Sequence, residues 1–329
     1  MIRDERRVFT RIDWESHVAN MTEKEFRRFY RMKPKVFYEI LHDIAHKIKK
    51  NEQMGYVSTT SGCVEPRVRL AVALRFLAGG SYLDISKLFG VSENNVYTCV
   101  WDVVLAVNET YDFPWMTKNK LDVEKMEETL PGIAEGFKAK SDGDLFDKCI
   151  GALDGWLPII AKPPQGVVGS RNQMYCIKGF YSVNVQAVSD AKRRFLYYDI
   201  SCYGSTHDSL AFLVSSLYDV MSNLHLDYYL VADAAYTATE WCLVPFKGNC
   251  IYILYLIICS NILNIYINVS SGENLSRNNP IKDTYNFYQS QVRINVECAF
   301  GSVGSLFLSS SVSFVLIKLK SNFKLKYQA

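Results

Sequence analysis

The sequence of 329 residues lacks the features that define several classes of protein. Its nine cysteines include no C-x-x-C pair and have no histidine at zinc-finger spacing, which excludes a structural zinc site. No internal repeat and no heptad array occurs. The first residues, MIRDERR, contain no apolar run, so we expect no signal peptide there. A net charge of +3 is too small by itself to indicate a nucleic-acid partner.

The composition is that of a globular protein large enough for two domains. Hydrophobic residues make up 49% of the chain and charged residues 22%. Cys149, Cys202 and Cys298 lie in apolar or motif contexts, and we expect them to be small buried thiols in the reduced state. Reduced thiols are typical of an intracellular protein, so we expect the nucleus or the cytoplasm. Residues 1–50 carry 13 Lys and Arg against 8 Asp and Glu, a local excess of 13 − 8 = +5. These cations could bind the phosphate backbone of a nucleic acid, or they could form a solvated basic surface.

The first third of the chain has helical periodicity. Thr22 and Glu25 form a capping box before a helix that begins near residue 23. Amphipathic helices are predicted over 35–48 and 67–78, with a loop at 51–66 between them. A short helix at 82–89, a Gly-containing turn and a helix from residue 93 then predict a helix-turn-helix.

In a helix-turn-helix the second helix enters the major groove of DNA. The residues expected to face DNA are Ser92, Glu93, Asn94, Asn95 and Tyr97. Val91, Val96 and Val100 are expected to pack inside. A plain helical hairpin is the alternative, and the second helix is poor in Lys and Arg. Another part of the chain, or a separate protein, would then supply much of the DNA binding.

Short β-rich runs dominate after residue 145. Strands are predicted at 150–153, 158–162, 181–189, 195–201 and 228–232, with a helix from about 205 to 220. A helical stretch at 122–140 looks like a linker. Three antiparallel strands, a helix and a further strand predict an α/β layer architecture.

Three acidic residues, Asp154, Asp233 and Glu297, lie in contexts that suggest catalysis. Asp154 and Asp233 each end an apolar run, and an ionised carboxylate there needs a charged partner. A divalent cation is the usual partner, since Mg²⁺ prefers oxygen ligands. Glu297 lies on a predicted helix face with Ile294 and Phe300. The alternative is that the aspartates cap turns and the glutamate is a solvated charge.

The segments around these acids share a distinctive set of motifs in a fixed order. They are GALDGW at 151–156, KGFYSVNVQ at 178–186, GSTHDS at 204–209, ADAAY at 232–236, and YNFY at 285–288 followed by ECAFG at 297–301. These motifs resemble those of the PIF/Harbinger-type transposases and the nucleases derived from them, within the DDE superfamily of endonucleases. Over residues 145–301 the resemblance implies an RNase H-like nuclease core, a mixed sheet flanked by helices, preceded by the all-helical region.

The resemblance implies a catalytic and metal-binding triad of Asp154, Asp233 and Glu297. It also implies a divalent cofactor, Mg²⁺ or Mn²⁺, and DNA as substrate. The expected activity is endonuclease or transposase-like cleavage of phosphodiester bonds, with two metals about 3.5–4 Å apart. A Myb-like DNA-binding partner protein, a homo-oligomer and a nuclear location are further expectations. The alternative is a catalytically inactive, domesticated DNA-binding or interaction module.

Three further residues are accessory candidates for the active site. His207 next to Asp208 could shuttle a proton or orient a water, although Thr206 or Asp208 could instead cap the helix that follows. Lys178 could contact phosphate, or lie over Phe180.

Two segments depart from the family pattern. Residues 250–269 are apolar and uncharged, so a membrane anchor is a third hypothesis, but the asparagines there would be costly facing lipid. We interpret 249–272 as an insertion arising from a mispredicted gene model. The tail at 302–329 is also aberrant, and we therefore expect the helix that carries Glu297 to be poorly supported. The predicted organisation is a tail at 1–20, a DNA-binding region at 21–120, a linker helix at 121–144 and the nuclease domain at 145–301.

Overall fold

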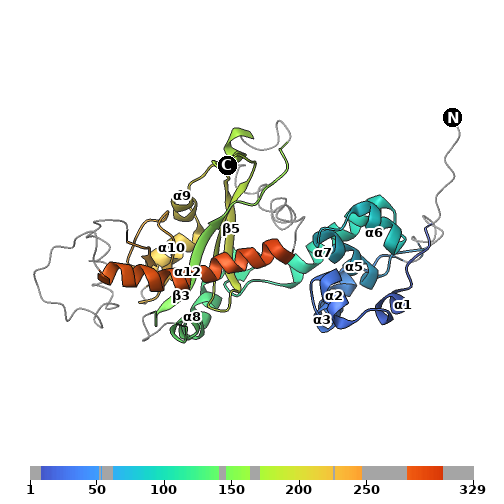
Figure 1. Ribbon diagram of the computed structural model, residues 1–329, viewed down its shortest axis with the longest axis horizontal. Coiled ribbons are helices and arrows are strands. Elements are labelled where there is room, and N and C mark those ends of the chain that lie inside the picture. The colour runs from blue at the N-terminus through green and yellow to red at the C-terminus, as the bar shows by residue number, and fades with distance from the viewer. Residues whose placement is uncertain are drawn as a thin grey trace, which may run out of the picture. The chain divides into compact units, whose positions relative to one another are not determined.

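A computed structural model describes residues 9–51, 53, 62–140, 146–163, 171–224, 227–246 and 280–306. Contacts within the chain divide it into two compact units (Figure 1). The first ends at Asp112, and the second runs from Phe113 to Ser302. The apolar segment at 250–269 and most of the tail at 302–329 lie outside the described residues.

The first unit is built from helices. They are α1 (Trp14–Ala19), α2 (Glu23–Tyr30), α3 (Pro34–Ile48), α5 (Pro66–Leu77), α6 (Tyr82–Phe89) and α7 (Glu93–Thr110). The predicted capping box is confirmed, because the Thr22 side chain accepts from the Glu25 backbone and Glu25 returns a bond to the Thr22 backbone. Trp14, Phe26, Tyr30 and Phe37 gather in the core of this unit.

A tight turn separates α6 from α7. Gly90 adopts a left-handed conformation with φ of 61°, and an added Cβ would lie 1.8 Å from the Thr10 carbonyl oxygen, so only glycine fits there. Val91, Val96 and Val100 are buried as predicted. Ser92 caps α7 by accepting from the Asn95 backbone at 3.3 Å. The pair forms a helical hairpin with a Gly-containing turn.

The second unit contains a five-stranded mixed sheet with strand order β5-β4-β3-β6-β7. The strands are β3 (Cys149–Trp156), β4 (Val183–Ser189), β5 (Phe195–Tyr203), β6 (Tyr229–Val231) and β7 (Cys242–Leu243). β3, β4 and β5 are antiparallel neighbours, whereas β6 runs parallel to β3 and β7 parallel to β6. A small separate sheet joins β1 (Met116–Thr117) to β2 (Lys120–Leu121). The strand predicted at 158–162 is reduced to a single bridge between Ile159 and Ser182.

Helices cover both faces of the larger sheet. Side chains alternate along a strand, so Gly155 and Trp156 on β3 face opposite sides. An added Cβ on Gly155 would meet Asp208 at the start of α9 (Asp208–Leu213), which places α9 on the Gly155 face. Helix α10 (Ser216–Asn223) lies on the same face, where the Tyr197 hydroxyl forms a hydrogen bond with Ser216. The Trp156 ring packs against Phe300 of α12 (Pro280–Leu306), which places α12 on the second face. Figure 1 shows α12 crossing the strands.

Two helices of this unit differ from the sequence-based expectations. α8 (Val123–Lys138) continues through Pro131 and packs against β3, so the stretch expected to be a linker contributes to the sheet unit. Its Gly136 lies in ordinary contact distance of Ala191, at 3.6 Å from an added Cβ. The helix predicted over 205–220 is interrupted at Val214 and Ser215, and the structure has α9 and α10 instead.

The expectation that the Glu297 helix is poorly supported is wrong for the residues described. α12 spans 27 residues, and Tyr285, Gln289, Val292, Val296 and Ala299 form its buried face. Their spacing of three and four residues is that of one helix stripe, which explains why the helix docks on the sheet. Within the described part of the chain, no helix is both long and apolar enough to cross a membrane.

Candidate active site

Asp154 lies within β3 and not at its end. β3 continues to Trp156 because the antiparallel partner β4 extends alongside it, pairing Asp154 with Ala187 and Trp156 with Val185. The parallel neighbour β6 ends earlier, at Val231. The Asp154 side chain therefore projects from β3 on the α12 face of the sheet, past the point where β6 ends.

Asp233 lies in the turn that follows β6. The parallel strands β3 and β6 pair Ala152 with Val231, so Asp154 on β3 and Asp233 in the turn after β6 each stand two residues beyond this pair. One Asp233 carboxylate oxygen accepts from the Ala235 backbone at 2.7 Å, and its carbonyl accepts from the Tyr236 backbone at 3.3 Å. These bonds fix the turn and leave the second carboxylate oxygen for another ligand.

The surroundings of Asp154 disfavour the ionised form of its carboxyl group. Its pKa is raised to about 6: burial is the largest cause, and the negative charges of Asp233 and Asp208 also contribute to the rise. A hydrogen bond from the Gly155 backbone at 2.9 Å and the positive charge of Arg293 act in the opposite direction. A half-buried carboxyl near the negative charge of Asp233 is an environment that favours a bound cation.

Glu297 reaches the same face of the sheet on α12 but is engaged by Arg293. The two side chains form an ion pair across one helical turn. The Arg293 side chain is 22% exposed and that of Glu297 is 46% exposed. Ile294, which the sequence analysis placed on the Glu297 face, is also exposed. The charges of Asp233 and Asp208 thus act on Asp154, and Arg293 acts on Asp154 while it is paired with Glu297.

Polar side chains early in α12 anchor this helix to the strand ends. The Gln289 amide donates to the Ala232 carbonyl at 2.6 Å, directly before Asp233, and Gln289 is buried. The Asn286 side chain accepts from the Phe246 backbone at 2.8 Å, and Tyr285 donates to the Val244 carbonyl at 3.5 Å. The sequence analysis did not identify Gln289 or Arg293. They lie eight and four residues before Glu297, which places them near its face of the helix. This spacing is the sequence signal that could have identified them.

A buried polar network connects the two aspartate segments on the opposite face of the sheet. Asp208 accepts from Asn184 at 2.9 Å and from Gln186 at 3.1 Å. The Tyr236 hydroxyl donates to the amide oxygen of Gln186 at 2.6 Å. Asn184, Gln186 and Tyr236 are buried, and Tyr236 follows Asp233 in the same turn. The network therefore joins β4, α9 and the Asp233 turn behind the site.

The accessory candidates occupy distinct positions. His207 is the N-cap of α9, where its Nδ1 accepts from the Ser209 backbone at 3.3 Å, so neither Thr206 nor Asp208 provides the cap. Lys178 is exposed in the turn before Gly179. On α7, Glu93, Asn94 and Tyr97 are exposed, and the Tyr97 ring lies 5.5 Å from that of Phe76.

The donor groups fit a hard cation only in part. Asp154 and Asp233 supply carboxylate oxygens, which hard cations prefer. The raised pKa of Asp154 shows that its charged form is disfavoured by burial, and a bound cation would stabilise that form. However, no group of three or more His, Cys, Asp or Glu side chains among the described residues is arranged to hold a metal ion. The third predicted ligand, Glu297, is held by Arg293.

Comparison with known families identifies a sequence model that matches part of the chain. Residues 153–312 match the sequence model of the family described as DDE superfamily endonuclease. The match begins one residue before Asp154 and includes Asp233 and Glu297. No curated protein and no solved structure matches the chain. The second unit therefore carries an α/β domain similar to DDE superfamily endonucleases, with a mixed sheet flanked by helices.

Proposed function

We propose that this protein is a metal-dependent DNA endonuclease of the Harbinger transposase type. The observation that carries the proposal is the placement of Asp154 and Asp233, each two residues beyond the Ala152–Val231 pair of the parallel strands β3 and β6, inside the segment that matches the DDE endonuclease family. Three antiparallel strands followed by two parallel ones support an RNase H-like core. The hairpin of α6 and α7 supports a helix-turn-helix that presents Ser92, Glu93, Asn94, Asn95 and Tyr97 to DNA.

Asp154 and Asp233 would hold the divalent cation, Mg²⁺ or Mn²⁺. When bound, such an ion stabilises the negative charge that develops on phosphate oxygens during phosphodiester cleavage by water or a DNA 3′-hydroxyl. Asp154 would have to be deprotonated, which its pKa of about 6 allows at neutral pH. Glu297 would complete the site once Arg293 releases it, and a DNA phosphate is a suitable new partner for the Arg293 guanidinium.

The cleavage of supercoiled plasmid tests this proposal. Purified protein with Mg²⁺ or Mn²⁺ is expected to nick the plasmid, and EDTA is expected to stop nicking. Asp154→Asn removes the charge but keeps the shape of the side chain, and it should abolish nicking. Nicking by the Asp154→Asn variant at the wild-type rate would refute the assignment.

A second candidate function is a catalytically inactive DNA-binding module. The ion pair between Arg293 and Glu297 favours it, because that pair keeps the third carboxylate from joining Asp154 and Asp233. Folded protein that binds duplex DNA but never nicks it with either metal would support this candidate. A Myb-like partner protein, a homo-oligomer and a nuclear location accompany either candidate as parts of the proposal.

A further inference from the structure

The charges of the first unit are segregated between its helices. α7, the helix expected to enter the major groove, contains no Lys or Arg and three acidic residues, Glu93, Asp102 and Glu109. Asp102 and Glu109 are ion-paired with Lys50, Arg69 and Lys47. α7 therefore offers no cation to a DNA backbone, although phosphate contacts supply much of the affinity of DNA-binding proteins.

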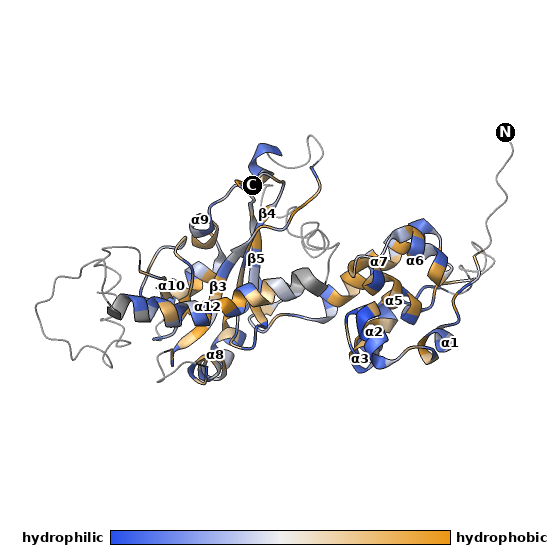
Figure 2. Ribbon diagram, viewed as in Figure 1, coloured by the Kyte–Doolittle hydropathy of each residue, from blue (hydrophilic) through white to orange (hydrophobic). Residues whose placement is uncertain are grey.

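The cations gather instead on α2 and the corner that follows it. Residues 21–35 contain six Lys and Arg against two Glu, an excess of 6 − 2 = +4. Lys24, Arg27 and Arg28 recur at the spacing of one helix stripe, and Arg31 follows them as the left-handed C-cap of α2. The opposite face of α2 buries Phe26 and Tyr30 in the core, which fixes the rotation of the helix. Figure 2 shows α2 as hydrophilic over most of its length.

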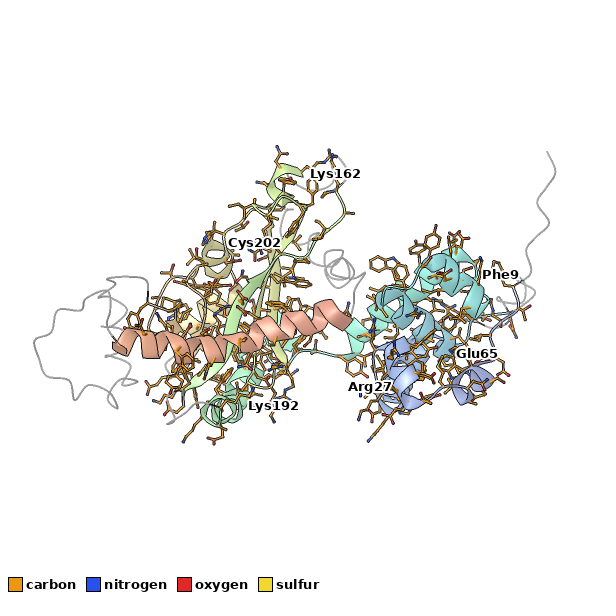
Figure 3. All side chains as sticks on the ribbon, in the orientation of Figure 1. Phe9, Arg27, Glu65, Lys162, Lys192 and Cys202 are labelled. Carbon is orange, nitrogen blue, oxygen red and sulfur yellow. The ribbon has the colours of Figure 1, made fainter. Side chains whose placement is uncertain are left out.

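The cations of this stripe face solvent. Lys24, Arg27 and Arg28 are exposed and Arg31 is half-buried, and Figure 3 shows Arg27 on the outer side of this unit. Glu25, the nearest acid, is engaged by Thr22 in the capping box, at 2.8 Å from both the Thr22 backbone nitrogen and hydroxyl. The described structure records no ion pair within 4.0 Å for Lys24, Arg27, Arg28 or Arg31. Four adjacent like charges repel one another, and a polyanion removes that repulsion.

We propose that the basic stripe of α2, formed by Lys24, Arg27, Arg28 and Arg31, binds the phosphate backbone of duplex DNA. The stripe positions the first unit on the duplex, while the sequence-reading contacts come from another surface or another protein. This inference rests on the proposed function for the identity of the polyanion. It does not depend on whether the nuclease site is active.

The test is the salt dependence of DNA binding by the full chain, measured by fluorescence anisotropy with a labelled duplex and EDTA present. Each phosphate contact contributes about 0.9 to the slope of log K against log salt concentration. Arg27→Gln/Arg28→Gln should therefore reduce the slope by about 1.8 and leave the melting temperature unchanged, since both side chains are exposed. Arg27→Lys/Arg28→Lys keeps the charges and should keep the slope.

A charge-matched control is available in the second unit. Lys192 and Arg193 are exposed in the turn between β4 and β5 (Figure 3), and this turn lies at the end of β3 remote from Asp154 because β4 is antiparallel to β3. Lys192→Gln/Arg193→Gln should leave the slope unchanged. An unchanged slope in the α2 variant, or an equal reduction in the control, overturns the inference. A reduced slope in a protein that never nicks DNA keeps this inference and rejects the nuclease.

Discussion

Arg293 and Glu297 form an ion pair across one turn of α12, and the same Arg293 guanidinium lowers the pKa of Asp154 on the neighbouring strand. One arginine thus compensates two of the three carboxylates that the family resemblance assigns to catalysis. Gln289, two turns before Glu297, holds the helix against Ala232, next to Asp233. The register of α12 on the sheet therefore decides which charges meet at the site.

Replacing Arg293 with Gln should raise the pKa of Asp154 above its value of about 6, because a nearby positive charge is lost. We expect a rise on the order of half to one pH unit. The measurement is a carboxyl-carbon NMR titration of metal-free protein. Arg194→Gln is the control, since Arg194 pairs with Asp190 at 2.7 Å and is not among the charges that shift the pKa of Asp154. An unchanged Asp154 titration in Arg293→Gln would show that the guanidinium does not act on it.

Asp154 should make the stability of the metal-free protein depend on pH. Its pKa is raised in the folded state from the ordinary 3.8 to about 6, so the folded state binds more protons between these values. Stability then falls as pH rises from about 4 to about 6. Asp154→Asn lacks this penalty and should be more stable than wild type at pH 7 by on the order of 1–2 kcal/mol, after allowance for partial exposure.

Urea unfolding with EDTA at pH 4 and pH 7 measures this effect. The advantage of Asp154→Asn should be present at pH 7 and largely absent at pH 4. Asp147→Asn alters an exposed carboxylate just before β3 and should show the same stability difference at both pH values. An advantage of Asp154→Asn that is equal at the two pH values would contradict the assigned cause.

Gly155→Ala should destabilise the second unit by roughly 2–4 kcal/mol. The added Cβ would lie 2.1 Å from a carboxylate oxygen of Asp208 and 2.9 Å from the Gln186 amide nitrogen, so α9 and β4 must separate and their hydrogen bonds weaken. Gly132→Ala is the matched control, because nothing lies within 4 Å of its added Cβ on α8. It should stabilise the helix by about 0.5–1 kcal/mol. Equal unfolding midpoints for the two variants would show that the close packing at Gly155 carries no energetic weight.

Local signals in the sequence predicted the elements of the first unit well. The spacing of apolar residues gave the positions of α3, α5 and α6 within one or two residues, and Thr22 with Glu25 marked the start of α2. The burial of Val91, Val96 and Val100 also followed from helical periodicity. These signals depend on residues close together in the chain, which is why a single sequence contains them.

Elements that depend on distant contacts were predicted less well. The strand was predicted to end at Leu153, whereas pairing with β4 extends β3 to Trp156. The short strand β7 was missed, since it exists through its parallel pairing with β6. α12 was expected to be poorly supported because its tail departs from the family pattern. In the structure, Gln289, Asn286 and Tyr285 of α12 form hydrogen bonds with the backbone of Ala232, Phe246 and Val244. These partners follow β6 and β7 and lie far from α12 in the sequence.

The sequence by itself determined which acidic residues are candidates for catalysis, because the motifs around Asp154, Asp233 and Glu297 are local patterns. It also determined that Lys24, Arg27 and Arg28 share one face of α2, since helical spacing aligns them. Only the tertiary structure decided that Asp154 and Asp233 stand side by side while Arg293 binds Glu297. The physical reason is that strand pairing and helix docking set the distances between charges, and electrostatic energy depends on those distances.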